Sequence, residues 1–259
     1  MDNYDKFVIA LKKKTEFDLS GYKRKQMERR ILSFMENLGY SNDYEKFMDK
    51  LVRDHKVCHE FFEHITINVS EFFRNPTQWE VLRRKILPEL IMEDKRLYVW
   101  SAGCSTGEEP YSLAITMEEY FSNQKYSIIA SDCDKDILQK AREGVYISKS
   151  VPEVSSRILD KYFTMQGDFF QIKDHLKKSI SFRNHNMLTE PFPKQMDLIV
   201  CRNVVIYFKD DVKDELYKNF FDALRPGGIL FTGSTEQLIQ AKELGFETAA
   251  PFFYRKPLR

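Results

Sequence analysis

The sequence predicts an α/β protein with a doubly wound, mostly parallel sheet, an N-terminal all-helical domain and a small antiparallel β insert. Short β-rich apolar runs alternate with helical stretches from about Trp79 onward, which is typical of a parallel sheet with helices on both faces. Residues 1–75 instead show helical periodicity, and no strand signal interrupts it. Apolar residues alternate across Tyr162–Lys173 on either side of Gly167, and this pattern indicates an antiparallel hairpin.

The helical domain is marked most clearly by the segment Tyr22–Leu38. Its apolar residues recur at the spacing of one helix face, and Gly39 supplies the C-terminal stop. Two further helices are expected at Asn42–Arg53 and Lys56–Thr66, each with one apolar side. Together these helices predict a small bundle.

The boundary between the two domains is expected near Pro76, because proline disfavours helix in the residue before it. We therefore place the helical domain at residues 1–75 and the sheet domain at residues 76–259, with the insert at about 160–178. The expected strands are Leu97–Ala102, Ser127–Ser131, Ile180–Arg183, Asp197–Cys201, Ile229–Thr232 and Phe252–Arg255. The expected helices among them are Glu108–Phe121, Lys135–Glu143, Asp211–Leu224 and Glu236–Lys242.

Composition excludes several classes of protein. The 259 residues carry a net charge of +1, so global charge favours no nucleic-acid partner. No apolar run approaches the ~18 residues of a membrane span, and the N-terminal order of acids, apolar residues and lysines is wrong for a secretory signal. The four cysteines lack a C-x-x-C spacing, which argues against zinc knuckles and favours a reducing, cytoplasmic setting; no metal is expected.

The stretch WSAGCSTGEEPYS, Trp100–Ser112, contains G-x-S-x-G, the pattern of a hydrolase nucleophile elbow. A nucleophilic Ser105 would need a histidine late in the chain, and the final 74 residues contain none. Glu108 and Glu109 would also oppose the negative charge that an oxyanion hole stabilises. The hydrolase interpretation is therefore rejected.

The same stretch fits a ligand loop at the carboxyl end of the first parallel strand. Ala102 and Gly103 allow the backbone to approach a ligand, whereas Glu109 would repel a pyrophosphate. Asp132 follows the second strand, where an acid binds ribose hydroxyls in nucleoside-binding sheets, and Asp134 suits the following helix as an N-cap. A sheet that binds ribose and avoids phosphate fits S-adenosylmethionine, whose sulfonium is cationic.

Two asparagines, Asn186 and Asn203, follow later strands of the predicted sheet. An amide both donates and accepts hydrogen bonds, which suits an adenine edge or an amino-acid group. The alternative for each is a loop or cap role.

Five blocks in order now carry a family resemblance: INVSEFFRNP, WSAGCSTGEEPYS, ASDCD, NHNML and CRNVVIYF. Together they resemble the chemotaxis receptor methyltransferases, protein-glutamate O-methyltransferases that transfer methyl groups from S-adenosylmethionine to glutamates on cytoplasmic helices of chemoreceptors. The resemblance covers nearly the whole chain. It implies a class I S-adenosylmethionine-dependent methyltransferase fold and S-adenosylhomocysteine as product.

Site residues implied by the resemblance lie in all five blocks. Ser70 stands where some family members have threonine, which keeps the hydroxyl. The family's insert binds a short receptor tail in some members, and nothing in this insert settles that point. The implied cofactor contacts are Asn68, Ser70, Arg74, Glu109, Asp132, Asn186, Met187, Asn203 and Val204.

The chemistry of glutamate methylation needs no strong base, because a carboxyl with a pKa of ~4.3 is already ionised at neutral pH. Arg74 is the candidate for orienting a carboxylate through its bidentate fork. Tyr207 is expected to line the methyl-transfer pocket, with a core aromatic as the alternative. Lys25 and Arg29 point away from the apolar stripe of their helix and would steer acidic receptor helices; the alternative is a solvated helix face.

Two other functions stay open from the sequence. One is an RNA methyltransferase that uses the basic helix as its nucleic-acid contact. The other is a non-catalytic, cofactor-binding signalling adaptor. We expect the receptor enzyme, acting as a cytoplasmic monomer without nucleic acid or membrane insertion.

Overall fold

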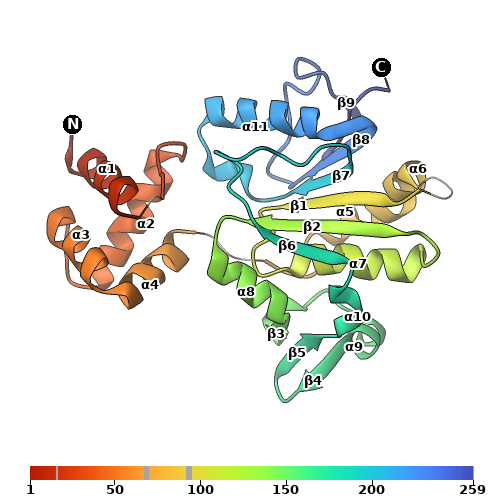
Figure 1. The fold of residues 1–259 in the computed structure, drawn as a ribbon, viewed down its shortest axis with the longest axis horizontal. Coiled ribbons are helices and arrows are strands. Elements are labelled where there is room, and N and C mark those ends of the chain that lie inside the picture. Colours follow the sequence, from red (N-terminus) through yellow and green to blue (C-terminus); the bar gives the residue numbers. More distant parts are fainter. Residues whose placement is uncertain (16, 67–69, 92–94, 259) are drawn as a thin grey trace. The chain divides into compact units, whose positions relative to one another are not determined.

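The computed structural model describes residues 1–15, 17–66, 70–91 and 95–258. The chain divides into two compact units (Figure 1). The helical unit contains Met1–Asn68 and Tyr207–Lys213, and the sheet unit contains Val69–Ile206 and Asp214–Arg259.

The helical unit is built on α1 (Asn3–Thr15), α2 (Arg24–Asn37), α3 (Tyr44–Arg53) and α4 (His55–Ile65). The last three confirm the helices expected from apolar periodicity. Their shared core is aromatic, and Phe47 and Phe61 within it are fully buried. Aspartates cap α3 and α4, satisfying backbone N–H groups that a helix start leaves unpaired.

Residues 207–213 belong to the helical unit through pairing with the segment before α2. The backbone N–H of Lys23 donates to the Tyr207 carbonyl at 2.9 Å, and that of Lys209 donates to the Gly21 carbonyl at 2.9 Å. The rings of Tyr22 and Phe208 also pack, with centroids 4.8 Å apart. A late segment of the chain thereby completes the helical unit, which sequence periodicity did not predict.

The sheet unit contains a seven-stranded sheet in the order β6-β2-β1-β7-β8-β10-β9. The first five strands in this order, from β6 through β2, β1 and β7 to β8, are parallel to one another. Strands β10 and β9 are antiparallel additions at one edge. The chain order reverses between β1 and β7, and this switch point is where open α/β sheets bind ligands. The strands are β1 (Leu97–Ala102), β2 (Tyr126–Asp132), β6 (Ile180–Asn184), β7 (Met196–Cys201), β8 (Leu224–Thr232), β9 (Glu247–Ala250) and β10 (Phe253–Arg255).

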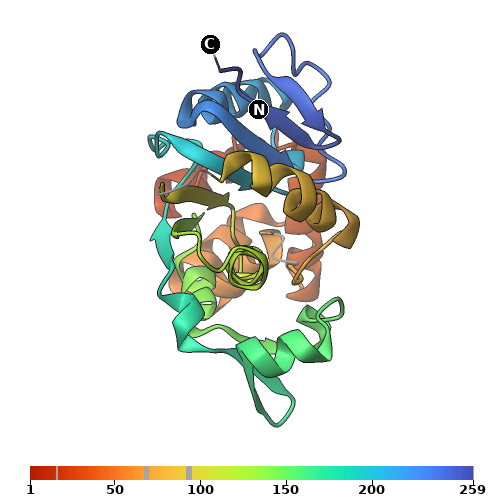
Figure 2. The same cartoon turned by 90° about the vertical axis from the view of Figure 1, so that its right-hand side faces the viewer.

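Helices cover the sheet and bury its apolar strands. Every residue of β7 is buried, as expected of a central parallel strand covered on both faces. Figure 2 looks along α7, which is seen end-on. The helices of this part are α5 (Pro76–Val81), α6 (Leu87–Leu90), α7 (Glu108–Tyr120), α8 (Lys135–Glu143) and α11 (Asp210–Ala223), with one π turn at Leu82–Ile86. Among the described residues, no helix has the length and apolarity that crossing a membrane requires.

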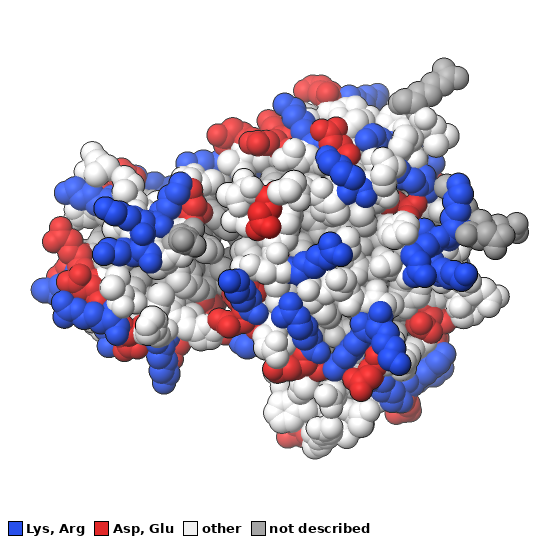
Figure 3. All heavy atoms as spheres, in the orientation of Figure 1, with Lys and Arg blue, Asp and Glu red and all other residues white. Residues whose placement is uncertain are grey.

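The insert is a three-stranded antiparallel sheet in the order β3-β5-β4. The expected hairpin is present as β4 (Phe163–Gln166) and β5 (Phe169–Ile172), flanked by α9 (Ser156–Tyr162) and α10 (Asp174–Lys177). Strand β3 (Val145–Ile147) adds a third strand, so this small sheet begins before the predicted residue 160. Three residues are too few for alternation to reveal a strand. The lower end of Figure 3, formed by the insert, is largely uncharged.

The sheet unit also begins earlier than the predicted residue 76. Phe72 is fully buried and packs edge-on against Tyr146 and Phe163 of the insert. The backbone N–H of Phe73 donates to the Ser112 hydroxyl at 3.0 Å. Pro76 therefore starts a helix inside the sheet unit instead of marking a domain boundary.

One predicted helix, Glu236–Lys242, is wrong: residues 236–238 have no regular structure, and residues 239–242 form turns. Its polar groups bind elsewhere in the sheet unit. The Glu236 carboxylate accepts from backbone N–H groups after β7, and the Leu238 N–H donates to the Tyr254 hydroxyl at 2.8 Å. Such tertiary contacts override a helical pattern.

Candidate active site

Strained backbone gathers in the loops at the carboxyl ends of β1 and β7 and in the segment bound to them. Phe73, Asn75, Ser105 and Asn203 have φ values of 53°, 60°, 49° and 60°. Left-handed backbone is unusual for residues other than glycine, above all for a bulky phenylalanine. Strain of this kind persists where the surrounding structure enforces it, and it clusters at functional sites.

The loop after β1 turns closely against the loop after β7. Gly103 has a φ of +76°, and a Cβ atom there would lie 2.6 Å from Cγ2 of Val204. The N–H groups of Gly103 and Cys104 both donate to the Ser131 carbonyl, at 2.8 and 2.9 Å. The two loops can therefore meet at this distance only because residue 103 has no side chain.

Asp132 ends β2 with its carboxylate held by backbone donors. Oδ2 accepts from the Ser105 N–H at 3.0 Å, and Oδ1 accepts from the Asp134 N–H at 3.1 Å. Each oxygen keeps a second lone pair, so the group can still accept from a ligand hydroxyl. Burial raises the pKa of Asp132, with these N–H donors acting in the opposite direction. Asp134 caps α8 through the N–H groups of Asp136 and Ile137, as expected.

Glu109, in the first turn of α7, is a partly buried carboxylate beside the buried Arg202. Oε1 accepts from the Ser101 hydroxyl at 2.8 Å, and Oε2 lies 3.8 Å from Nη1 of Arg202. Burial raises the pKa of Glu109 to about 7, against the opposing influence of Arg202, Ser101 and Arg74. Near neutral pH this carboxyl therefore changes charge readily, and a bound cation would favour its ionised form.

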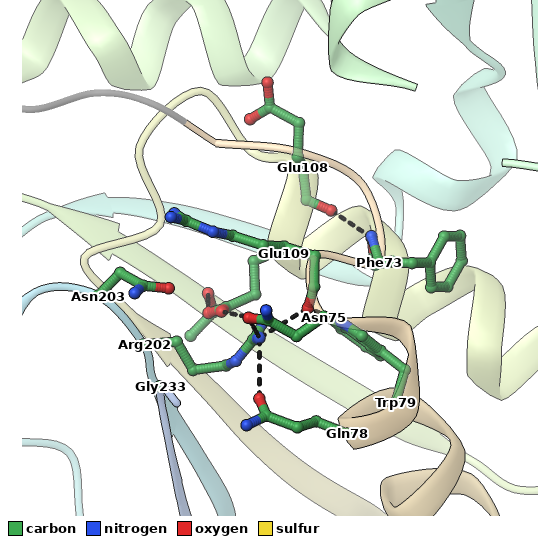
Figure 4. Close-up of polar contacts among 12 residues, drawn as sticks. Phe73, Asn75, Gln78, Trp79, Glu108, Glu109, Arg202, Asn203 and Gly233 are labelled. Carbon is green, nitrogen blue, oxygen red and sulfur yellow. Dashed lines mark hydrogen bonds and ion pairs between the residues drawn. The ribbon is translucent and has the colours of Figure 1, made fainter. Parts of the chain in front are cut away.

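Arg202, directly after β7, ties the segment before α5 to the sheet. Nη2 donates to the Arg74 carbonyl at 2.7 Å, to Oδ1 of Asn75 at 2.9 Å and to Oε1 of Gln78 at 3.0 Å. Figure 4 shows its guanidinium pointing toward Asn75, Gln78 and Glu109. The group also lies 4.8 Å from the centroid of the Phe231 ring. Arg202 thus fixes the strained backbone that carries Arg74.

The residues at this edge fit a cationic nucleoside. Asp132 offers acceptors for a ribose diol, and Glu109 offers negative charge. The hydroxyl of Ser105 is buried beside Asp132 and has no hydrogen-bond partner within the described residues. Residues 103–107 supply no lysine or arginine that would neutralise a phosphate. In the part of the chain that the structure describes, no cluster of three or more His, Cys, Asp or Glu side chains could hold a metal ion.

Two family models match this chain. The model described as "CheR methyltransferase, SAM binding domain" matches residues 68–250, and "CheR methyltransferase, all-alpha domain" matches residues 2–66. The chain belongs to the CheR methyltransferase family. The class I methyltransferase fold predicted from the sequence is thereby confirmed, and S-adenosylmethionine is the cofactor that the matched domain binds.

Relatives that match this chain over most of their length carry the name chemotaxis protein methyltransferase. The one from Listeria innocua is 42% identical over 255 residues, covering 98% of this chain and 97% of its own length. The one from Borreliella burgdorferi is 34% identical over 253 residues, covering 92% and 88%. The one from Salmonella typhimurium is 30% identical over 229 residues, covering 84% and 77%.

The structure brings several predicted residues of this CheR family member to one edge of the sheet. Ala102, Gly103, Glu109 and Asp132 end or follow β1 and β2, and Asn203 with Val204 follows β7. Ser70 hydrogen-bonds the buried Glu108 carboxylate. Asn68 lies outside the described residues.

Other predicted residues have different surroundings. Oδ1 of Asn186 accepts from the Leu188 N–H at 2.9 Å, which is the cap role considered as its alternative, and Met187 lies within that turn. Tyr207 belongs to the helical unit. Lys25 and Arg29 are exposed on α2, away from its buried side.

Two buried groups of this CheR site were not predicted. Arg202 and Glu236 hold the loops through long-range hydrogen bonds. The sequence signal for Arg202 was its position directly after the apolar run DLIVC. An arginine next to a buried strand needs buried hydrogen-bond partners. Glu236 gave no such signal, because it fits an amphipathic helix equally well.

Cofactor affinity is expected to increase about tenfold between pH 6 and pH 8. Burial raises the pKa of Glu109 to about 7, so the carboxyl is mostly protonated at the lower pH and ionised at the higher pH. A cationic ligand binds the ionised form better. Calorimetric titration with S-adenosylmethionine measures the effect, and Glu109→Gln should bind weakly without this pH dependence. Equal wild-type affinity at both pH values would contradict this assignment.

Proposed function

We propose that this chain transfers the methyl group of S-adenosylmethionine to glutamate side chains of chemoreceptors, forming methyl esters and S-adenosylhomocysteine. The observation that carries the proposal is the pair of carboxylates, Glu109 and Asp132, which follow β1 and end β2 beside the switch point of the sheet. They suit a cationic nucleoside, and family membership agrees with this ligand.

The cofactor, when bound, supplies a methyl group made electrophilic by the sulfonium. Asp132 accepts from the ribose hydroxyls, and Glu109 balances the positive charge. Gly103 has no side chain, so its backbone would be free to lie close to the ligand. The contacts proposed on family resemblance alone are Asn68, Ser70, Met187 and Val204. Asn186 and Asn203 are proposed also because their amides follow strands β6 and β7.

The substrate glutamate reacts as a carboxylate, so the chain needs to align it and exclude water. Arg74 is proposed to orient a carboxylate, because its backbone is fixed by Arg202 and its charge acts on Glu109. Tyr207 is proposed to line the path of the methyl group. We assign no residue the role of general base, because the substrate carboxylate is already ionised.

Methyl transfer to purified receptor-containing membranes tests the proposal. With radiolabelled S-adenosylmethionine, the label should enter membrane protein and leave as methanol after mild base, because esters hydrolyse and N-methyl groups do not. Base-stable label would overturn the proposed acceptor. Cofactor binding without any transfer would favour the signalling adaptor.

The basic face of α2 is proposed to dock receptors. Arg24 is engaged by Asp2, Asp5 and Glu28, so the exposed cations of this face are chiefly Lys25 and Arg29. Two cations suit an acidic helix better than the long phosphate track of RNA. We also propose that the protein works in the cytoplasm as a monomer, without nucleic acid, membrane insertion or metal.

Reversing Lys25 and Arg29 to glutamate is expected to raise the KM for receptor about tenfold at low salt and to leave cofactor affinity within about twofold. Long-range attraction to acidic helices is lost, and high salt should narrow the difference. Methylation rates at varied receptor concentration measure the change. Lys13→Glu with Lys14→Glu, equally exposed on α1, is the charge-matched control. If the charge reversal on α2 left receptor methylation unchanged at low salt, the docking proposal would be wrong.

A further inference from the structure

Glu236 gathers four backbone N–H groups on one buried carboxylate. Oε2 accepts from Asn203 at 2.6 Å and from Gly233 at 2.9 Å. Oε1 accepts from Val204 at 2.9 Å and from Ile206 at 3.3 Å. The residue is only 5% exposed. Three of these donors belong to the turn that follows β7, the central strand of the sheet.

This turn depends on an external acceptor. Asn203 is left-handed, with a φ of 60°, so the chain leaves β7 without continuing the ladder of strand hydrogen bonds. Buried N–H groups require partners, and a carboxylate has enough lone pairs for all of them. Hydrogen bonds to a charged acceptor are also about twice as strong as neutral ones.

Gly233 makes room for the arrangement. A Cβ atom at this position would lie 2.6 Å from Oε2 of Glu236 and 2.9 Å from the backbone nitrogen of Asn203. Only glycine therefore lets the carboxylate reach the turn. The opposite side of the turn is equally constrained, since Val204 lies where the missing Gly103 Cβ would be. The turn is held between a carboxylate and a glycine loop.

We propose that Glu236 is a positioning residue that holds the Asn203–Ile206 turn in its cofactor-binding conformation. The inference rests on the proposed function, because it takes Asn203 and Val204 as cofactor contacts. Glu236 acts through the turn's backbone. Loss of its acceptor oxygens would let Val204 shift against Gly103, where the two loops form one wall of the site.

The rival explanation is that Glu236 contributes stability alone, and Asp197 provides the matched control. Asp197 lies near the start of β7, is 7% exposed, and accepts from the Tyr98 N–H at 2.7 Å and from the Arg225 guanidinium. Asp197→Asn and Glu236→Gln each exchange one buried carboxylate for an amide of nearly the same size. Both should lower the thermal midpoint.

Calorimetry and steady-state kinetics separate the two explanations. Glu236→Gln should raise the Kd and KM for S-adenosylmethionine about tenfold, because an amide –NH2 faces backbone donors. The KM for receptor should stay within about twofold, and Asp197→Asn should leave both constants unchanged. Should Glu236→Gln fail to fold, Glu236→Asp decides, since the shorter side chain withdraws the carboxylate from the turn and should raise the same KM.

Wild-type cofactor affinity in the folded Glu236→Gln or Glu236→Asp protein would overturn the inference, as would equal losses in Asp197→Asn. These outcomes are distinct from failure of the proposed function. In that case the wild-type chain itself would not bind S-adenosylmethionine or methylate receptor.

Discussion

Arg202→Met is expected to destabilise the protein by about 3–5 kcal/mol and to abolish methyl transfer. The substitution removes the cation 3.8 Å from the partly buried Glu109 and leaves the Arg74 carbonyl and two side-chain oxygens without their donor. The pKa of Glu109 should then rise above about 7, so the carboxyl would be largely neutral during the reaction. Urea unfolding and cofactor titration measure the two effects.

Two further variants isolate the cause. Arg202→Lys keeps the charge but loses the planar fork, so it should regain part of the stability and little of the activity. Arg83→Met removes a more exposed arginine that pairs with Glu80 in the same unit, and it should cost less than about 1 kcal/mol. If Arg202→Met retained wild-type stability and cofactor affinity, Arg202 would have no role in holding Arg74 and Glu109.

Gly103→Ala is expected to weaken S-adenosylmethionine binding on the order of a hundredfold, because overpacking costs about 1–3 kcal/mol. The added Cβ meets Cγ2 of Val204 at 2.6 Å, and φ at this position is +76°. The loops after β1 and β7 would have to move apart to make room for the alanine side chain. Calorimetric titration of the folded variant measures the loss.

Gly39→Ala is a control for the strain that a left-handed backbone imposes on alanine. Gly39 has a φ of +79°, and an added Cβ would meet no atom within 4 Å. Gly39→Ala should therefore show the left-handed strain alone, about 1–2 kcal/mol of stability, with cofactor affinity intact. Adding Val204→Ala to Gly103→Ala should restore part of the affinity by removing the clashing methyl group. Equal affinity in the two glycine variants would refute the close approach of the loops.

The sequence predicted those parts of the fold that depend on local pattern. Apolar runs bounded by turn residues located β1, β2 and β7, and periodicity located α2 within about two residues at its start. Strand β3 was not predicted because it has only three residues. The domain boundary was predicted too late because Pro76 starts a helix within the sheet unit. Both errors concern segments whose state is decided by packing partners distant in the chain.

Residues of the site were likewise predicted where local pattern places them and missed where distant partners do. Gly103, Glu109 and Asp132 sit at strand and helix ends, where their residue types already limit what they can do. Arg202 and Glu236 could not be placed in the same way. Arg202 binds a carbonyl 128 residues away, and Glu236 binds a turn 33 residues away. Only the folded chain brings such partners together, so their positioning roles emerge from the structure.

Peptide mapping of a methylated receptor tests the central claim most directly. A purified cytoplasmic receptor fragment is incubated with this chain and S-adenosylmethionine, and its peptides are sequenced by tandem mass spectrometry. We predict methyl groups on glutamate side chains that mild alkali removes and that are absent when Asp132→Ala replaces the wild-type enzyme. Alkali-stable methyl groups on any other residue, or an unmodified receptor beside methylated RNA, would contradict the account.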